Sequence, residues 1–297
     1  MNKKFNLIIL GSSGQLGKEF QGLSNKYQKE FTYNFLTKGK YDVTKQMNIS
    51  ECLSDISENI IINCSAYTKV DLAEKEKEKA MLINGLALGN ITKIANDTNS
   101  TLVHFSTDYV FSGDNEIPYR EEDATDPQTS YGESKLYGEN LALNSTTKSI
   151  VIRTSWLYSS MSDNFVKTII SKSLTNETLN IVADQKGSPT YARDLAEAVL
   201  KLILLDRFKY SASKNSLYHY SNLGITSWYE FAYEIFKSIN ADVGRLNPIK
   251  TDAYNATAKR PKYSALNTSK IRDHFNLEIP LWEKSLMKCI NNMGMKS

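Results

Sequence analysis

Tyr131 and Lys135, which lie four residues apart, are the side chains whose types and spacing best suit proton transfer. Residues four apart share one face of a helix, so the lysine ammonium can lie beside the tyrosine phenol. A free tyrosine has a pKa of about 10. A neighbouring cation favours the phenolate, which brings the group closer to neutrality as a proton donor and acceptor. The pair therefore predicts acid–base chemistry on a substrate oxygen.

The spacing alone is a weak signal, because Tyr41, Tyr210 and Tyr233 are also followed by a lysine four residues on. We expect Tyr41 in a turn, Tyr210 in a polar loop and Tyr233 packed on an amphipathic helix. Only Tyr131 follows, at a modest distance, an expected strand that ends at Thr107. Doubly wound sheets bind ligands at the carboxyl ends of their strands. We therefore expect the Thr107 hydroxyl to hydrogen-bond the substrate carbonyl beside Tyr131.

Three glycines, Gly11, Gly14 and Gly17, form a second candidate site after the expected first strand. In that position the first glycine allows a tight turn, the second lets the backbone approach a pyrophosphate, and the third lets helix and strand pack closely. The N-terminus of the following helix offers unpaired N–H groups to phosphates. A glycine-rich turn without a ligand is the alternative. The spacing resembles that of short-chain dehydrogenases and predicts a bound nicotinamide dinucleotide.

The end of the expected second strand bears on which dinucleotide is used. NAD-specific enzymes usually place a carboxylate there for the ribose hydroxyls, whereas this chain has Lys38, Gly39 and Lys40. Lys38 is expected to meet the 2′-phosphate of NADPH, and a surface charge on a turn is the alternative. The prediction is therefore NADPH, with NADH as the alternative cofactor.

Strands and helices alternate along the first half, which indicates an α/β fold with a Rossmann-type, doubly wound parallel sheet. Apolar runs typical of strands buried on both faces occupy residues 5–10, 31–37, 60–65, 102–107 and 150–155. The clearest helix covers about 76–96, where apolar residues recur at helical spacing. Asn84 lies on the edge of that stripe and is expected to be a hydrogen-bonded packing residue, with a site role as the alternative.

The pattern changes after Trp156, which predicts a smaller C-terminal substrate domain interleaved with the first. Helical patterns cover 164–174, 227–239 and 281–293, strands are expected at 179–183 and 217–221, and a loop at 184–190. We expect a dinucleotide-binding Rossmann domain over 1–160 plus about 191–222. The substrate domain is expected over about 161–190 plus 223–297.

The composition excludes several classes of protein. No apolar run approaches the roughly 18 residues that a membrane helix needs, and the net charge of +3 is not gathered into a basic block that would indicate nucleic acid. Three scattered cysteines favour a reducing cytoplasm. We predict no metal ligand among the site residues. Glu121, Glu122 and Asp123 are expected in a solvated loop, with a metal site as the alternative, and residues 74–79 on a solvated helix face.

Together these segments resemble the dTDP-4-dehydrorhamnose reductase family of extended short-chain dehydrogenases. The resemblance spans nearly the whole chain, and several of its motifs, such as those at 106–111 and 131–135, are general to the superfamily. The more specific motifs are Gln15-Leu16, Val70-Asp71-Leu72-Ala73-Glu74 and Asp184-Gln185-Lys186-Gly187-Ser188-Pro189-Thr190.

The resemblance implies reduction of a dTDP-linked 4-keto-6-deoxy-hexose, dTDP-4-dehydro-L-rhamnose, to dTDP-L-rhamnose. It implies that Tyr131 protonates the C4 oxygen as hydride arrives from the nicotinamide, while Lys135 holds the nicotinamide ribose and tunes Tyr131. Thr107 and Asp108 would contact the hexose. Trp156 would lie against the sugar or its nucleotide, with a core position as the alternative. The residues implied to line the cofactor are Gly14, Gln15, Leu16, Asp42, Val43, Ala66, Tyr67 and Thr68.

The small domain would hold the diphosphate, with Arg260 as one contact and a surface ion pair as the alternative role of that arginine. Some relatives use a structural Mg²⁺ at a dimer contact, so Mg²⁺ and a homodimer are further expectations. The chain departs from the family at Leu72, where a basic residue is frequent, and at Cys64-Ser65-Ala66, where small residues are common. Related 4,6-dehydratases carry an acidic residue where this chain has Tyr109, so dehydration is not expected.

Two other functions fit parts of the pattern. One is a reductase or epimerase of another nucleotide-linked keto-sugar. The other is a non-catalytic NADP-binding regulatory subunit, similar to the β subunit of methionine adenosyltransferase. The intact set Thr107, Tyr131 and Lys135 favours an enzyme over a binding subunit.

Overall fold

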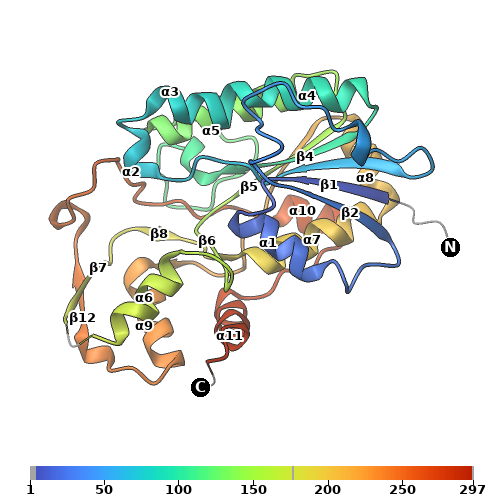
Figure 1. Ribbon diagram of the computed structural model, residues 1–297. Coiled ribbons are helices and arrows are strands. Elements are labelled where there is room, and N and C mark those ends of the chain that lie inside the picture. Colours follow the sequence, from blue (N-terminus) through green and yellow to red (C-terminus); the bar gives the residue numbers. More distant parts are fainter. Residues whose placement is uncertain (1–4, 176, 296–297) are drawn as a thin grey trace.

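A parallel sheet lies at the centre of the molecule, in a computed structural model that describes residues 5–175 and 177–295. Its strand order is β10-β5-β4-β3-β1-β2 (Figure 1). All six residues of β1 are buried, as expected for a strand covered on both faces. The strands are β1 (Phe5–Leu10), β2 (Phe31–Leu36), β3 (Glu58–Asn63), β4 (Thr101–Thr107), β5 (Ser149–Thr154) and β10 (Ser216–His219).

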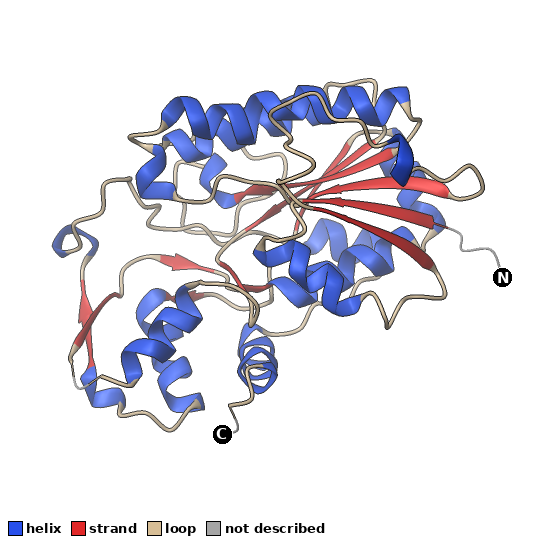
Figure 2. Cartoon of the chain, in the orientation of Figure 1, coloured by secondary structure: helices blue, strands red, loops and turns tan. Residues whose placement is uncertain are grey.

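Helices cover both faces of this sheet (Figures 1 and 2). On one face Leu88 and Ile91 pack onto the strands, and on the other face Phe20, Leu195 and Val199 do so. The upper layer in Figure 1 contains α3 (Lys77–Ala80), the π-helix η2 (Met81–Leu86), α4 (Ala87–Asp97) and α5 (Ser130–Leu143), preceded by α2 (Val70–Ala73). The other layer contains α1 (Gln15–Leu23), α7 (Ala192–Ile203), α8 (Asp206–Ser213) and α10 (Ser269–Phe275).

The direction in which strands are added reverses beside β1, because β2 pairs with one of its edges and β3 with the other. In open α/β sheets, ligands bind in the crevice at the carboxyl ends of the strands at such a point. The glycine turn follows β1, residues 64–69 follow β3, Thr107 ends β4, and Trp156 follows β5. The fold therefore brings the predicted site segments to one edge of the sheet.

A smaller lobe lies beyond that edge, and aromatic side chains such as Tyr158, Phe231 and Trp282 form its core. A capping box starts the helix α9 (Trp228–Ser238): the Ser227 hydroxyl accepts from the Glu230 N–H (3.1 Å), and the Glu230 carboxylate accepts from the Ser227 N–H (2.8 Å). The elements of the smaller lobe are β6 (Leu157–Tyr158), α6 (Phe165–Ser173), β7 (Leu179–Val182), β8 (Lys186–Gly187), β9 (Thr190–Tyr191), β11 (Thr226–Ser227), α9, β12 (Leu246–Ile249) and α11 (Trp282–Asn292). The 3₁₀ helices of the chain are η1 (Ser50–Cys52), η3 (Asp108–Val110), η4 (Val243–Arg245) and η5 (Thr251–Ala253).

The predicted division into two domains stays a prediction. Residues from α7 and β10, such as Leu195 and Tyr218, pack in the same apolar cluster as α1. Ile271 and Phe275 of α10 also belong to that cluster, although the sequence places them in the second domain. The last part of the chain thus returns to the sheet before α11 completes the smaller lobe.

The helix predicted over 76–96 is interrupted by a π-helical segment. The interruption lies where α5 crosses so closely that a Cβ on Gly138 would be 2.1 Å from the Asn84 carbonyl oxygen. A stripe of apolar residues does not reveal such a crossing, whereas the bounds of β1 match the prediction fully. The Asn84 amide bonds the N–H and C=O of Tyr67 and the hydroxyl of Ser134, which confirms it as a hydrogen-bonded packing residue.

Several local predictions are wrong because contacts distant in sequence override local polarity. Tyr210 lies in α8, and the segment predicted as a loop contains β8 and β9, which pair with β11 and β6. Glu121 is buried and accepts from the His219 N–H (2.8 Å), so it does not lie in a solvated loop. Glu74 and Glu76 are also more than solvated charges, because they bond Ser130 and the Tyr67 phenol.

The described residues bear on the expectations about a membrane helix and a metal ion. Among these residues, no helix combines the length and the apolar character that a membrane crossing requires. The described part of the chain also holds no group of three or more His, Cys, Asp or Glu side chains placed to bind a metal ion. The expected Mg²⁺ therefore gains no support.

Candidate active site

The turn after β1 is closed by packing that requires glycine at two positions. Gly11 has a φ of +69°, and a Cβ there would lie 2.7 Å from the backbone nitrogen of Ser65, which follows β3. Gly17 lies in the first turn of α1, where a Cβ would be 2.5 Å from the Cα of Ser12. The predicted tight turn is confirmed, and Gly17 lets α1 pack closely against the turn that follows β1.

The N-terminus of α1 differs from those of α5, α6 and α9. Its cap, Gly14, brings no side chain to the first-turn N–H groups, whereas the side chains of Thr129, Asn164 and Ser227 each accept such a bond in α5, α6 and α9. The Ser12 hydroxyl beside it is buried and has no hydrogen-bond partner among the described residues. An uncapped helix end with a spare hydroxyl fits the phosphates of a dinucleotide.

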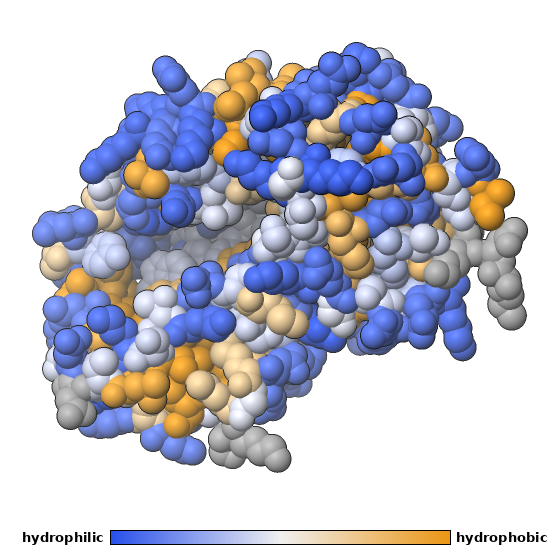
Figure 3. Space-filling view, in the orientation of Figure 1, coloured by the Kyte–Doolittle hydropathy of each residue, from blue (hydrophilic) through white to orange (hydrophobic). Residues whose placement is uncertain are grey.

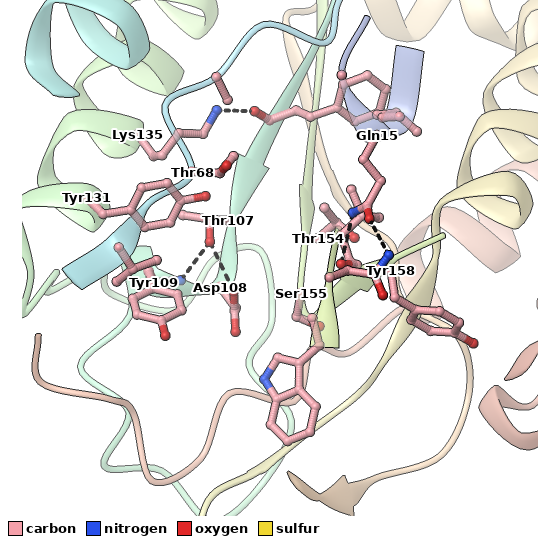
Figure 4. Close-up of a pocket in the computed structure, with 18 of the residues that line it drawn as sticks. Gln15, Thr68, Thr107, Asp108, Tyr109, Tyr131, Lys135, Thr154, Ser155 and Tyr158 are labelled. Atoms are coloured by element: carbon pink, nitrogen blue, oxygen red, sulfur yellow. Dashed lines mark hydrogen bonds between the residues drawn. The ribbon is translucent and has the colours of Figure 1, made fainter. Parts of the chain in front are cut away.

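Two hydroxyl groups face the same space at the end of β4 (Figure 4). Tyr131 lies in the first turn of α5, and Thr107 is the last residue of β4, where its hydroxyl donates to the Asp108 carboxylate (3.0 Å). Burial raises the pKa of Tyr131, and a hydrogen bond from Thr107 lowers it in part, so the phenol carries its proton at neutral pH. Burial also raises the pKa of Asp108 to about 6.

Lys135 lies one turn further along α5 and is only 3% exposed. Its ammonium donates to the Phe105 carbonyl (2.5 Å). Burial lowers the pKa of Lys135 to about 8, and the Glu139 carboxylate offsets part of that shift. The lowering of the Tyr131 pKa expected from Lys135 is not seen, because burial of the phenol dominates and the ammonium is bound to a backbone carbonyl.

A buried ion pair fixes α5 to β5 behind this wall. Arg153 donates from Nε and Nη2 to the two carboxylate oxygens of Glu139, at 3.0 and 2.5 Å, and both side chains are at most 3% exposed. The guanidinium lies over the Phe111 ring (4.9 Å to its centroid) and 3.3 Å from His219 Nε2. Burial lowers the pKa of His219 to about 3, so this ring is neutral and can accept from the arginine.

One cavity of about 590 Å³ lies between the edge of the sheet and the smaller lobe. Its volume is within the range of small-molecule sites, about 300–1,000 Å³, and Figure 3 shows its opening as a hollow between the two lobes. Tyr131 and Thr107 lie on one side of it and Gln15 on the other (Figure 4). The predicted residues that line it are Gly14, Gln15, Leu16, Ala66, Thr68, Thr107, Asp108, Tyr131, Lys135, Trp156 and Arg260.

The other predicted cofactor residues do not line this cavity. Gly11 and Gly17 shape the turn, Val43 is buried, and the phenol of Tyr67 bonds Glu76. Lys38 is exposed after β2, and Asp42 accepts bonds from Thr44. Lys38, Asp42 and Val43 stay predictions for the part of a dinucleotide that lies beyond the cavity.

Aromatic rings form the wall opposite Tyr131. Trp156 has a φ of +46°, a backbone conformation that residues with a side chain rarely adopt. Its indole stacks on that of Trp228, with centroids 3.5 Å apart and planes 8° from parallel, and Phe165 and Phe231 continue the wall. Sequence reasoning missed Trp228, Phe165 and Phe231. A capping signal at Ser227 preceded Trp228, but nothing local placed it against Trp156.

Arg260 lines the cavity and is also part of an ion pair, so the ion-pair role is confirmed and the contact with a diphosphate stays a prediction. It donates from Nη1 to the Tyr109 phenol (2.8 Å) and from Nη2 to the Asp71 carboxylate. The Tyr109 ring meets Tyr131 edge-on, with centroids 5.5 Å apart. No acidic residue takes the place of Tyr109 after Asp108, so a 4,6-dehydratase arrangement is absent from this part of the described chain.

The glycine turn after β1 and the Tyr131–Lys135 pair, joined by one cavity, define a Rossmann-fold oxidoreductase of the short-chain dehydrogenase class. The model of one family, described as the RmlD substrate binding domain, matches residues 5–295. The dTDP-4-dehydrorhamnose reductase of Salmonella typhimurium is 34% identical over 302 residues, with 97% of this chain and 98% of the relative covered. The chain belongs to the dTDP-4-dehydrorhamnose reductase family.

Other similar proteins agree with this membership. The spore coat polysaccharide biosynthesis protein SpsK of Bacillus subtilis is 38% identical over 267 residues, which cover 90% of each chain. A crystal structure of dTDP-4-dehydrorhamnose reductase from Bacillus anthracis in complex with NADP matches with a TM-score of 0.87 and 38% identity, over 97% of this chain and 99% of that one. A dTDP-glucose 4,6-dehydratase from Streptomyces venezuelae, at 13% identity and a TM-score of 0.76, shares the fold.

Proposed function

We propose that this chain catalyses the NADPH-dependent reduction of the C4 keto group of dTDP-4-dehydro-L-rhamnose to give dTDP-L-rhamnose. The observation that carries the proposal is the placement of the Tyr131 and Thr107 hydroxyls at one point of a cavity that begins at the uncapped end of α1. The names of the curated relatives support the choice of substrate.

Each residue of this wall has a distinct part in the proposed reaction. A bound NADPH supplies the hydride. Tyr131, which burial keeps protonated, donates its proton to the C4 oxygen as negative charge develops there. The Thr107 hydroxyl polarises the same oxygen, and Lys135 holds the nicotinamide ribose. Asp108 and Trp156 contact the hexose.

The preference for NADPH rests on Lys38 and on the NADP bound in the Bacillus anthracis relative. Lys38 is exposed after β2, where it can reach a 2′-phosphate without losing a described partner. Comparison of kcat/KM for the two cofactors tests this choice. The account predicts a preference for NADPH that Lys38→Gln reduces, and a strong NADH preference in the unaltered chain would contradict it.

The substrate assignment is tested by NADPH oxidation with dTDP-4-dehydro-L-rhamnose and, in parallel, with UDP- and GDP-linked keto-sugars. We expect turnover with the dTDP-sugar. Turnover only with another nucleotide sugar would replace this substrate by the alternative reductase or epimerase. Binding of NADPH without turnover of any keto-sugar would leave the regulatory subunit as the function. Assembly as a homodimer stays a prediction.

A further inference from the structure

The short helix α2 and the residue that follows it carry two carboxylates that the proposed reaction does not use. Asp71 and Glu74 belong to the family-like motif of residues 70–74. The two carboxylates hydrogen-bond different segments. Asp71 bonds residues 258 and 260 of the smaller lobe, whereas Glu74 bonds Ser130 at the start of α5. One short segment after the predicted cofactor loop thus contacts both the catalytic helix and the substrate side of the cavity.

Asp71 holds a segment that crosses to the mouth of the cavity, residues 251–260, which we call the strap. Its Oδ1 accepts from the Ala258 N–H (3.0 Å), and its Oδ2 pairs with Arg260 Nη2. One carboxylate therefore fixes both the backbone of the strap and the head group of its arginine. The strap needs such an anchor, because its residues 252–255 are exposed and bury little surface of their own.

The pairing leaves Arg260 able to bind a ligand. A guanidinium has five N–H groups, and bonds to Tyr109 and Asp71 use two of them among the described residues. The arginine side chain is 23% exposed and lines the cavity, so the remaining donors can reach an anion there. A planar guanidinium that is held on one edge is oriented for phosphate oxygens on the other.

Glu74 holds the first turn of the catalytic helix. Its Oε1 accepts from the Ser130 N–H (2.8 Å) and its Oε2 accepts from the Ser130 hydroxyl (3.0 Å). Ser130 is the first residue of α5 and directly precedes Tyr131. A carboxylate at a helix N-terminus satisfies a free N–H and is favoured by the helix dipole. The position of the Tyr131 backbone therefore depends on Glu74.

We propose that Asp71 and Glu74 are positioning residues, the two ends of one clasp: Asp71 sets Arg260 for the diphosphate of the substrate, and Glu74 sets Tyr131 for proton transfer. The proposal rests on the proposed function of the cavity. The two ends act on different parts of the substrate. Loss of Asp71 weakens the contact of Arg260 with the diphosphate, which is equally strong in the ground state and the transition state. Loss of Glu74 instead displaces Tyr131 from the position that proton transfer requires.

The Asp71 end is tested with Asp71→Asn, which keeps an oxygen for Ala258 but loses the charged acceptor for Arg260. We expect KM for the sugar nucleotide to rise about tenfold, with kcat and the KM for NADPH unchanged, and the affinity for dTDP measured by calorimetry to fall equally. Addition of Asp71→Asn to Arg260→Gln should then have no further effect, because the asparagine acts only through Arg260. Additive effects, or an unchanged KM, would overturn the role of Asp71.

The Glu74 end is tested with Glu74→Ala and Glu74→Gln. We expect Glu74→Ala to lower kcat about tenfold while KM for the sugar nucleotide and the affinity for dTDP stay unchanged. Glu74→Gln should recover most of kcat, because the amide oxygen still accepts from the Ser130 N–H. The same loss in both variants, or equal changes in kcat and KM, would overturn the role of Glu74.

A matched control separates the clasp from general effects on the strap. Lys259 is exposed, neighbours Arg260 and bonds only the Gln128 amide among the described residues, so Lys259→Gln should leave both kcat and KM unchanged. If the unaltered chain binds dTDP but does not reduce the keto-sugar, the proposed function fails, while the Asp71 end is still judged by dTDP binding. If the unaltered chain turns over and the variants match it, only the clasp fails.

Discussion

The two walls of the cavity are held in place by different forces. On the sheet side, hydrogen bonds set Thr107 and Lys135, Tyr131 lies in the first turn of α5, and the buried pair Glu139–Arg153 lies behind them. On the opposite side, Trp156 and Trp228 are set mainly by the stacking of one ring on another. Hydrogen bonds fix the positions of single polar atoms, whereas stacked rings supply a large apolar area.

The difference matches what each wall has to do. Proton transfer requires donor and acceptor atoms at fixed positions, and the sheet wall supplies them. In the proposed reaction the C–H face of the sugar ring would lie on the aromatic wall. Substitutions on the sheet wall should therefore change kcat or stability, and substitutions on the aromatic wall should change KM. The following predictions test this contrast.

The largest effect is expected for Tyr131→Phe. Loss of the proton donor should lower kcat by about 100- to 10,000-fold, while NADPH affinity measured by fluorescence titration stays unchanged. Tyr137→Phe is the matched control, because Tyr137 lies on the same helix and is 44% exposed. Unchanged turnover of Tyr131→Phe would remove this tyrosine from the mechanism.

The next effect concerns the ion pair behind the sheet wall. Glu139→Leu should lower the free energy of unfolding by about 3–5 kcal/mol, because Arg153 would be left buried without its carboxylate. Urea denaturation measures this loss. The double variant Glu139→Leu/Arg153→Met should regain most of the stability, since paired apolar side chains replace a buried ion pair well. A double variant that is no more stable to urea than the single variant would show that Glu139 stabilises the fold through a contact other than Arg153.

A smaller effect is expected on the aromatic wall. Trp228→Leu removes the ring that stacks on Trp156, and such a pair contributes about 0.5–1.5 kcal/mol. KM for the sugar nucleotide should therefore rise a few-fold to about tenfold, with kcat nearly unchanged. Tyr233→Leu on the same helix, at a side chain 38% exposed, should change neither constant. A loss confined to kcat would break the contrast between the walls.

The smallest effect near neutral pH is a pH dependence from Lys135. Burial lowers its pKa to about 8, so its ammonium is lost as the pH rises through that value and is fully present well below it. Since kcat/KM reports ionisations of the free enzyme, it should fall to about half near pH 8 and then about tenfold per further pH unit. A profile that stays flat through pH 9 would contradict this role of the ammonium.

The sheet wall could be predicted from the sequence because its signals are local. The strand ending at Thr107 is an apolar run, and the pair Tyr131 and Lys135 lies one helical turn apart. Gly17 likewise reports a close approach within one strand–turn–helix unit, to Ser12. Such features depend on backbone geometry that a short stretch of sequence determines.

The aromatic wall and the clasp could not be predicted in the same way. Trp156 and Trp228 are brought together only by the fold of the smaller lobe, and Asp71 and Arg260 are 189 residues apart. The prediction that Lys135 lowers the pKa of Tyr131 is wrong, because it assumes a contact between the lysine and the phenol. In the structure Lys135 donates to the Phe105 carbonyl, and burial of the phenol raises the pKa of Tyr131. Spacing shows which residues can meet, but burial and competing partners decide their ionisation.

The transfer of hydride to the sugar carbonyl tests the central claim most directly. The chain would be incubated with dTDP-4-dehydro-L-rhamnose and NADPH that carries deuterium at both positions of C4 of the nicotinamide, and the product examined by NMR. The account predicts dTDP-L-rhamnose with deuterium at C4 of the sugar, formed by the unaltered chain and by Tyr137→Phe but hardly at all by Tyr131→Phe. A product without deuterium at C4, or equal labelling by Tyr131→Phe, would contradict it.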